Sequence, residues 1–103
     1  MALELRPNCE CCDRDLPPAS SEARICSFEC TFCEACVTTV LENVCPNCGG
    51  GFERRPIRPS REWRRGLSVA QRPPSPTRHH MAIAREEAAA FAERLRDIPP
   101  GRR

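Results

Sequence analysis

The 103-residue sequence has few residues for a hydrophobic core, since it contains no Tyr, one Trp and four Phe. No apolar stretch approaches the roughly 20 residues that a membrane-spanning helix needs. These absences exclude a transmembrane protein, and they also exclude a domain held together by apolar burial alone, because small chains bury a modest part of their surface. We therefore expect metal ions or disulfides to supply the missing stability.

We also expect no secretory signal peptide, because the opening residues Met1–Arg6 are too few and too charged to form one. We therefore predict a reducing, cytoplasmic location, where closely spaced cysteines act as metal ligands rather than disulfides. The odd number of cysteines, nine, agrees with this view. Lysine is missing as well, and the use of arginine alone is typical of a GC-rich bacterial genome.

Charge divides the chain into two halves. Residues 1–52 hold three Arg against eight Asp and Glu, whereas residues 53–103 hold thirteen Arg against six Asp and Glu. The formal net charges are therefore −5 and +7. An acidic, cysteine-rich half is joined to a basic tail.

The spacing of the cysteines is the strongest signal in the sequence. With Cys11 set aside, eight cysteines form four pairs with two or three residues between the members: Cys9 and Cys12, Cys26 and Cys30, Cys33 and Cys36, Cys45 and Cys48. Such a pair can place two sulfurs at about 2.3 Å from one zinc ion, and structural zinc takes four ligands in a closed tetrahedron. We predict two structural Zn²⁺ ions, with no position open for a catalytic water and no enzymatic activity.

The order of the pairs resembles that of the RING finger, in which ligand pairs interleave. The resemblance implies a small metal-stabilised α+β module with a cross-brace and a treble-clef core. Site 1 would then be Cys9, Cys12, Cys33 and Cys36, and site 2 would be Cys26, Cys30, Cys45 and Cys48, with Cys30 where a RING finger usually has His. Sequential pairing is the alternative, with Cys9, Cys12, Cys26 and Cys30 on one ion, but the eight residues from Cys36 to Cys45 are short for a free-standing second unit. Ubiquitin ligase activity is not expected, since Cys11 and Gly49 depart from the ligase pattern.

A closer resemblance rests on more than the cysteines. The stretches Leu5–Asp13, Arg24–Cys36, Asn43–Gly50 and Arg54–Pro56 resemble the bacterial DUF1272 family of short, cysteine-rich proteins with no assigned function. This resemblance covers about residues 1–59. It implies a bacterial zinc-binding protein and supplies no activity.

Three segments follow from composition. Residues 1–53 are predicted to form the two-zinc module, with a hairpin arm at 24–30 and a short helix at 36–43. Residues 54–77 are predicted to be a flexible linker, because residues 54–79 hold eight Arg and five Pro. Residues 78–98 are predicted to hold an amphipathic helix over 78–97, with Thr77 as N-cap and with His79 and His80 as opening residues rather than metal ligands.

The apolar stripe of this predicted helix consists of Met81, Ala84, Ala88, Phe91, Ala92 and Leu95. The stripe can pack on the zinc module or on a second copy of the chain, which would give a homodimer.

Three classes of function stay open. The first is a protein-interaction adaptor with an unknown partner, because closed zinc modules usually present surfaces. The second is a nucleic-acid-binding protein, whose contacts would be Arg54, Arg55, Arg58, Arg61, Trp63, Arg64 and Arg65. The third is a redox or zinc sensor that uses Cys11, which is otherwise a spare, small buried residue.

Overall fold

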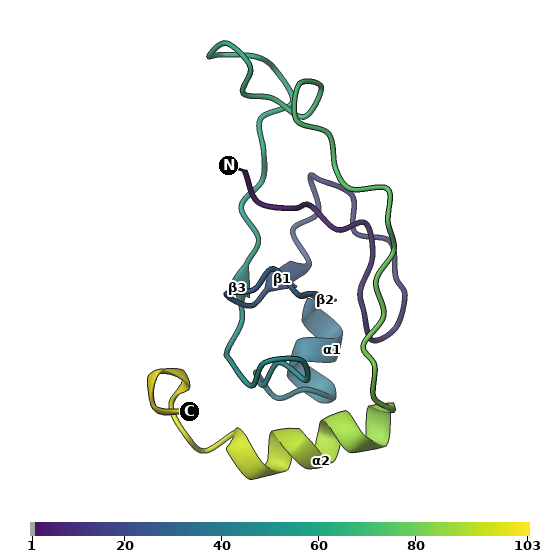
Figure 1. Ribbon diagram of the computed structural model, residues 1–103, viewed down its shortest axis with the longest axis vertical. Coiled ribbons are helices and arrows are strands. Elements are labelled where there is room, and N and C mark those ends of the chain that lie inside the picture. The colour runs from purple at the N-terminus through teal and green to yellow at the C-terminus, as the bar shows by residue number, and fades with distance from the viewer. Residues whose placement is uncertain (1) are drawn as a thin grey trace.

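The computed structural model describes residues 2–103 and contains a three-stranded antiparallel sheet (Figure 1). The central strand β1 (Ala23–Ile25) lies between β2 (Thr31–Cys33) and β3 (Glu53–Arg54). The register pairs Arg24 with Phe32 on one side and with Arg54 on the other. Together with the helices described below, this sheet confirms the predicted small α+β fold.

The predicted hairpin arm at 24–30 contains the turn itself. β1 ends at Ile25, and the chain reverses between Cys26 and Cys30, where the Cys26 N–H donates to the Cys30 carbonyl at 3.1 Å. Glu29 adopts the left-handed conformation with φ of 67°. The turn places one cysteine at each end of the loop, next to the sheet.

Helix α1 (Glu34–Thr39) follows β2 without a connecting loop. It starts earlier and ends earlier than the predicted 36–43. Cys33 is its N-cap, and Glu34 favours the first turn because a carboxylate there complements the helix dipole. The helix stops because Glu42 and Asn43 have φ of 45° and 61°, which a right-handed helix does not allow.

Helix α2 (Arg85–Leu95) covers the end of the molecule that holds α1 (Figure 1). Ala88 and Ala92 are its buried residues, so its apolar stripe packs on the cysteine-rich module of the same chain. The helix was predicted to start at residue 78 with Thr77 as N-cap, but it starts at Arg85 with Ala84 in that position.

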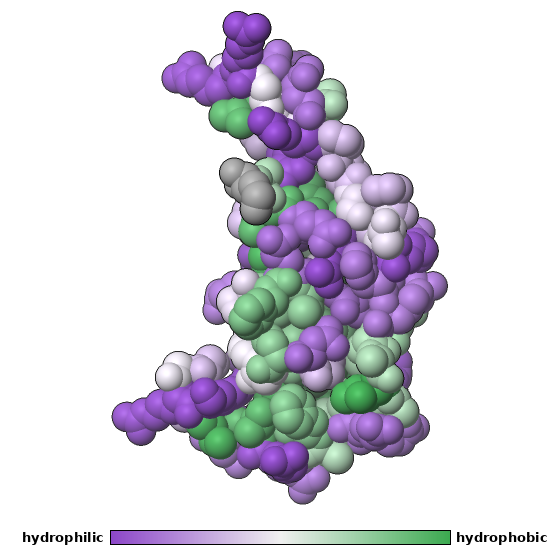
Figure 2. Space-filling model, viewed as in Figure 1, coloured by the Kyte–Doolittle hydropathy of each residue, from purple (hydrophilic) through white to green (hydrophobic). Residues whose placement is uncertain are grey.

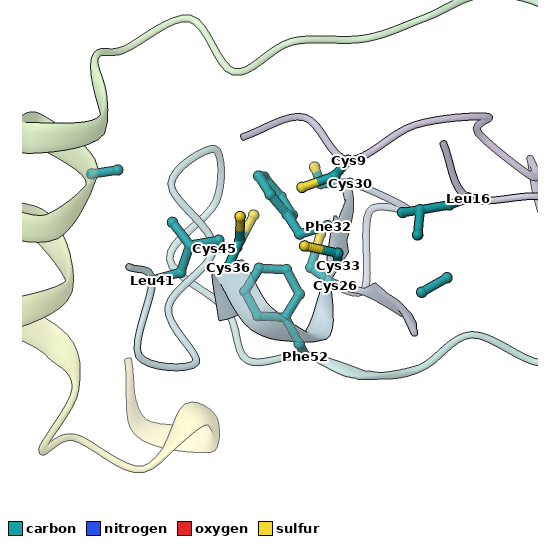
Figure 3. Packing of buried hydrophobic residues seen from close by; sticks show 12 residues of the cluster. Cys9, Leu16, Cys26, Cys30, Phe32, Cys33, Cys36, Leu41, Cys45 and Phe52 are labelled. Atoms are coloured by element: carbon teal, nitrogen blue, oxygen red, sulfur yellow. The ribbon is translucent and has the colours of Figure 1, made fainter. Parts of the chain in front are cut away.

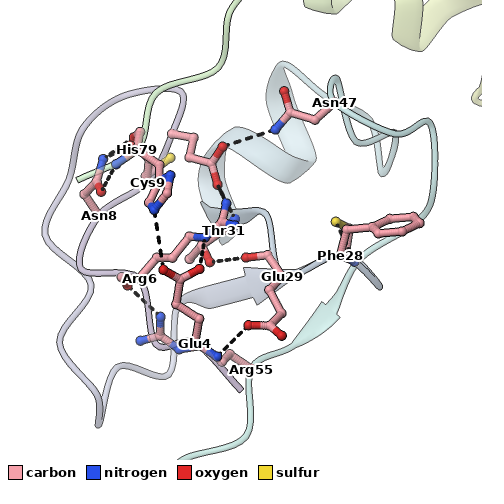
Figure 4. Close-up of polar contacts among 12 residues, drawn as sticks. Glu4, Arg6, Asn8, Cys9, Phe28, Glu29, Thr31, Asn47, Arg55 and His79 are labelled. Atoms are coloured by element: carbon pink, nitrogen blue, oxygen red, sulfur yellow. Dashed lines mark hydrogen bonds and ion pairs between the residues drawn. The ribbon is translucent and has the colours of Figure 1, made fainter. Parts of the chain in front are cut away.

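The late start of α2 has a physical cause in residues 78–81, which run in extended form beside the N-terminal segment. The Asn8 side chain donates to the His79 carbonyl at 2.7 Å and accepts from the His79 N–H at 3.1 Å (Figure 4). The Arg78 guanidinium pairs with Asp13 and Asp15, each at 2.8 Å. One of these bonds occupies the His79 carbonyl, which in a longer helix would have accepted the N–H of residue 83.

The core is small and lies between the sheet, α1 and the loops that follow. Phe32 and Phe52 meet edge to face, with ring centroids 5.3 Å apart, and Leu16 and Leu41 are fully buried (Figure 3). Cysteines make up a large part of the same cluster. Among residues 2–103, no helix combines the length and apolar character required to cross a bilayer.

The arginine- and proline-rich segment leaves the sheet after β3 and returns along the N-terminal segment (Figure 1). Its return is tied by a hydrogen bond from the Ser75 N–H to the Leu5 carbonyl at 3.0 Å. The predicted boundary at residue 53 falls inside β3, so the module continues into this segment. Flexibility of residues 54–77 stays a prediction.

Candidate metal centre

Four cysteine sulfurs from two parts of the chain meet in a first group. Cys9 and Cys12 come from a turn near the N-terminus, while Cys33 ends β2 and Cys36 lies in the first turn of α1. All four sulfurs lie within 4.8 Å of one another, and those of Cys12 and Cys33 are 3.7 Å apart. All nine cysteines are free thiols, so this closeness is not that of a disulfide.

The backbone around Cys9 explains how two sulfurs face the same point. The Asp13 N–H donates to the Cys9 carbonyl, and the Cys9 N–H donates to the Arg14 carbonyl, both at 2.8 Å. Asp13, directly after the pair, has φ of 65°. The Cys12 N–H points at the Cys9 sulfur at 3.5 Å, which favours a thiolate there.

The same turn recurs at Cys45–Cys48. The Gly49 N–H donates to the Cys45 carbonyl at 2.7 Å, and the Cys45 N–H donates to the Gly50 carbonyl at 2.8 Å. Gly49 follows the pair with φ of 82°, a conformation that glycine adopts without steric cost. Two turns of matching hydrogen bonds therefore present two pairs of sulfurs.

The second group contains Cys26, Cys45 and Cys48, whose sulfurs also lie within 4.8 Å of one another. Cys30 is buried beside this group but outside that distance. It shares the buried cluster with Cys26, and the Cys26 N–H donates to the Cys30 carbonyl at 3.1 Å. The structure thus groups the first cysteine pair with the third, and the second pair with the fourth, with Cys30 adjacent. Both groups could hold a metal ion.

Cys11 lies next to the first group. It is partly buried and packs against the core cluster that contains Cys36. A fifth thiol therefore lies beside a centre at which a tetrahedral ion uses four.

Burial governs the acidity of the deepest thiols. It raises the pKa of Cys9 to about 11, and it raises the pKa of Cys36 and Cys45 further still. Neighbouring cysteines add to the rise at Cys36 and Cys45, because several negative sulfurs cannot lie together without a cation. Without metal, Cys9, Cys36 and Cys45 therefore hold their protons at neutral pH, and a bound cation would have to displace them.

A buried carboxylate connects the two cysteine turns. Glu10, 4% exposed, sits inside the first turn and accepts from the Asn47 side chain inside the second at 3.1 Å. It also accepts from the Thr31 N–H at 2.7 Å and pairs with the Arg6 guanidinium at 2.9 Å. The relative position of the two groups is thus set partly by one side chain.

Comparisons with known proteins identify a family for the cysteine-rich part of the chain. The family model described as "Protein of unknown function (DUF1272)" matches residues 2–58, which hold all nine cysteines. The chain belongs to this family. An uncharacterized protein of the bacterium Rhizobium meliloti (strain 1021) is 67% identical over 58 residues, covering 56% of this chain and 69% of the relative. No solved structure matches the chain.

Within the segment that the family model matches, one predicted nucleic-acid contact, Arg55, lies in the interior of the protein rather than at its surface. Arg55 is 2% exposed, and its guanidinium donates to the carbonyls of Arg6, Leu16 and Pro17 at 2.8, 3.1 and 3.0 Å. It is a structural residue of the module, and the expectation of a phosphate contact there is wrong.

The other predicted contacts lie at or near the surface: Arg54, Arg58, Arg61, Trp63, Arg64 and Arg65. Binding of nucleic acid by these residues stays a prediction. His79 and His80 belong to neither cysteine group; their rings lie 3.6 Å from Glu4 and 4.0 Å from Asp13.

Sequence analysis missed Asn8, Glu10 and Arg55. Their polar side chains are buried through partners far away in the chain, and no local pattern marks such partners. The one available signal was position, since Glu10 and Asn47 each stand inside a cysteine pair.

Proposed function

We propose that the chain is a structural zinc module that holds two ions and presents its surface to a partner protein. The observation that carries this proposal is the first cysteine group, in which four sulfurs lie within 4.8 Å of one another. A tetrahedral ion with zinc–sulfur bonds of about 2.3 Å has sulfurs about 3.8 Å apart along each edge. The 3.7 Å between Cys12 and Cys33 fits that edge.

The second ion would be held by Cys26, Cys45 and Cys48, with Cys30 as the fourth ligand. Cys30 lies in the same buried cluster as Cys26 and Cys45, beside the group that it would complete. Four thiolates around each ion would complete both tetrahedra.

The order of elements supports a treble-clef core of the RING type. A cysteine turn is followed by the β1–β2 hairpin and then by α1, whose first residues carry the second half of the first group. The second group joins the hairpin loop to the later turn, which is the interleaved arrangement of a cross-brace. Zinc would then supply much of the folding free energy, since structural sites contribute on the order of 10 kcal/mol in small peptides.

A structural role follows from the ligand set. Four thiolates leave no position for a water molecule, and an open position is what catalytic zinc requires. A rigid module of this kind acts by binding, which favours an adaptor over an enzyme.

The proposal is tested by native mass spectrometry of the reduced protein after purification without added metal. We expect two zinc ions, and we expect Cys33→Ser to lose one while the matched variant Cys11→Ser keeps both. Removal of zinc by EDTA should abolish the native far-UV circular dichroism spectrum. A protein that carries fewer than two ions, or that keeps its spectrum with EDTA, would contradict the proposal.

A second candidate function is a thiol sensor, which the packing of Cys11 against the cluster that contains Cys36 favours. Hydrogen peroxide would oxidise the two thiols to one disulfide and be reduced to two waters, so that Cys36 leaves the metal. We expect Cys11→Ser to slow zinc release by peroxide severalfold if this function holds. Equal release from both proteins would exclude it.

A further inference from the structure

Among residues 2–103, four of the five exposed large hydrophobic residues belong to one end of the molecule. They are Leu3, Ile57, Trp63 and Leu67, whereas Phe28 lies apart in the hairpin loop. Three of the four line a pocket of about 440 Å³, a size within the range of known ligand pockets. Exposed apolar residues gathered in one concave site indicate a binding surface.

The pocket is assembled from three stretches of chain that hydrogen bonds hold together. The Arg58 guanidinium donates to the Leu3 carbonyl at 2.7 Å and to the Arg72 carbonyl at 2.5 Å. The Val69 N–H donates to the Pro59 carbonyl at 2.9 Å. These bonds connect the N-terminal segment, the stretch after β3 and the returning chain, so the walls are formed before any ligand arrives.

The loop of residues 60–72, which we term the arginine loop, brings positive charge to this pocket and contributes Leu67 and Arg72 to its lining. It carries Arg61, Arg64, Arg65 and Arg72, and none of these forms an ion pair within residues 2–103. Glu62 is its one acidic residue, and that carboxylate accepts from the Gly66 N–H. In the space-filling view this end is mostly hydrophilic, with hydrophobic atoms between (Figure 2).

We propose that the pocket and the arginine loop bind an acidic segment of a partner protein that inserts an aliphatic side chain. This inference rests on the proposed function, because it names the surface through which the adaptor binds. The aliphatic lining, from Leu3, Ile57 and Leu67, accepts a Leu- or Ile-like anchor, while the arginines attract the carboxylates on either side.

Nucleic acid fits this surface less well. Binding of single strands relies on aromatic side chains on which successive bases stack, and the arginine loop offers Trp63 alone. A pocket lined by aliphatic side chains has no counterpart on a base or a phosphate. The family match ends at residue 58, so the loop adds a wall that the matched segment does not contain.

The test uses the full zinc-loaded chain and a fluorescein-labelled peptide in which two leucines are flanked by Asp and Glu. Fluorescence anisotropy should show binding that weakens as salt rises, because screening reduces attraction between exposed charges. Two control peptides replace the leucines by Ser or the acidic residues by Lys. We expect both controls to bind at least about tenfold more weakly.

Matched protein variants locate the site. Leu67→Asp should weaken binding of the acidic peptide by about tenfold. Phe28→Asp, at a still more exposed apolar position elsewhere, should leave that binding unchanged. Equal binding of the peptide without leucines would overturn the proposal, as would no binding at all. Tight binding of a labelled oligothymidine or of anionic vesicles that survives Leu67→Asp would do the same.

The zinc count of each protein separates this inference from the proposed function. If the wild-type chain and Leu67→Asp both carry two zinc ions and neither binds the peptide, only the docking site is wrong. If the wild-type chain lacks the ions, the proposed function fails first.

Discussion

Substitution of Arg55 by Met offers a direct test of how the module is held together. The change keeps much of the aliphatic stem and removes the guanidinium, which is buried and has no carboxylate partner among the described residues. Burial lowers the pKa of Arg55, and the charge of Arg58 lowers it further. Hydrogen bonds to three backbone carbonyls therefore offset the free-energy cost of removing this cation from water.

The expected loss in the free energy of unfolding follows from the carbonyl groups that the substitution leaves without a donor. The Pro17 carbonyl keeps a second donor, the Ser20 N–H at 2.8 Å, but those of Arg6 and Leu16 lose the donor that Arg55 supplies. A buried polar group without a partner costs about 1–3 kcal/mol. Two such groups, less the gain from no longer burying a charge, give a loss of about 3 kcal/mol in the free energy of unfolding.

Urea unfolding followed by circular dichroism, at one fixed concentration of free zinc, measures this loss. The zinc concentration must be held constant because bound metal shifts apparent stability. The control is Arg54→Met, one residue earlier and exposed on β3, for which we expect a change within about 0.5 kcal/mol. If both variants unfold at the same urea concentration as the wild type, the structural role of Arg55 is refuted.

Three further predictions follow. Glu10→Ala removes the contact between the cysteine turns and should lower the free energy of unfolding by about 2–3 kcal/mol. Asn47→Ala removes only the hydrogen bond to Glu10 and should lower it by about 1 kcal/mol. Equal urea midpoints for the two variants would contradict this prediction. Because burial raises the pKa of Cys9 to about 11, its thiol is protonated at neutral pH without metal, so zinc binding should release protons and strengthen as pH rises. Calorimetry in buffers of different ionisation enthalpy measures that release, and a pH-independent affinity would rule it out. Gly49→Ala should lower the free energy of unfolding by about 1–2 kcal/mol, because φ is 82° and the added Cβ would lie 3.4 Å from Leu95. Gly66→Ala is the control for the backbone strain alone, since φ is 80° there and the added Cβ would meet open space. Thermal melts should give Gly49→Ala the lower melting temperature of the two.

Local features were predictable from the chain because they depend on residues close in sequence. The turns at Cys9–Cys12 and Cys45–Cys48 are closed by hydrogen bonds between residues close in sequence, and a positive φ follows each pair. Cys33–Cys36 has the same spacing but begins α1, so the helix was predicted near this pair while its start at Glu34 was not. The helix at the C-terminal end was predicted from its alanines and leucine, but its start was placed too early. Asn8 and Asp13 bind residues 79 and 78 and keep them outside the helix.

The sequence by itself determined that the acidic end of the chain forms a small α+β module in which nine cysteines dominate and apolar side chains are few. Only the tertiary structure decided which pairs meet and which arginine goes inside. The composition of residues 54–65 makes every arginine look solvated, yet the fate of Arg55 depends on carbonyls supplied by residues 6–17. Burial of a cation requires acceptors brought together from distant parts of the chain, and spacing along the sequence does not encode that meeting.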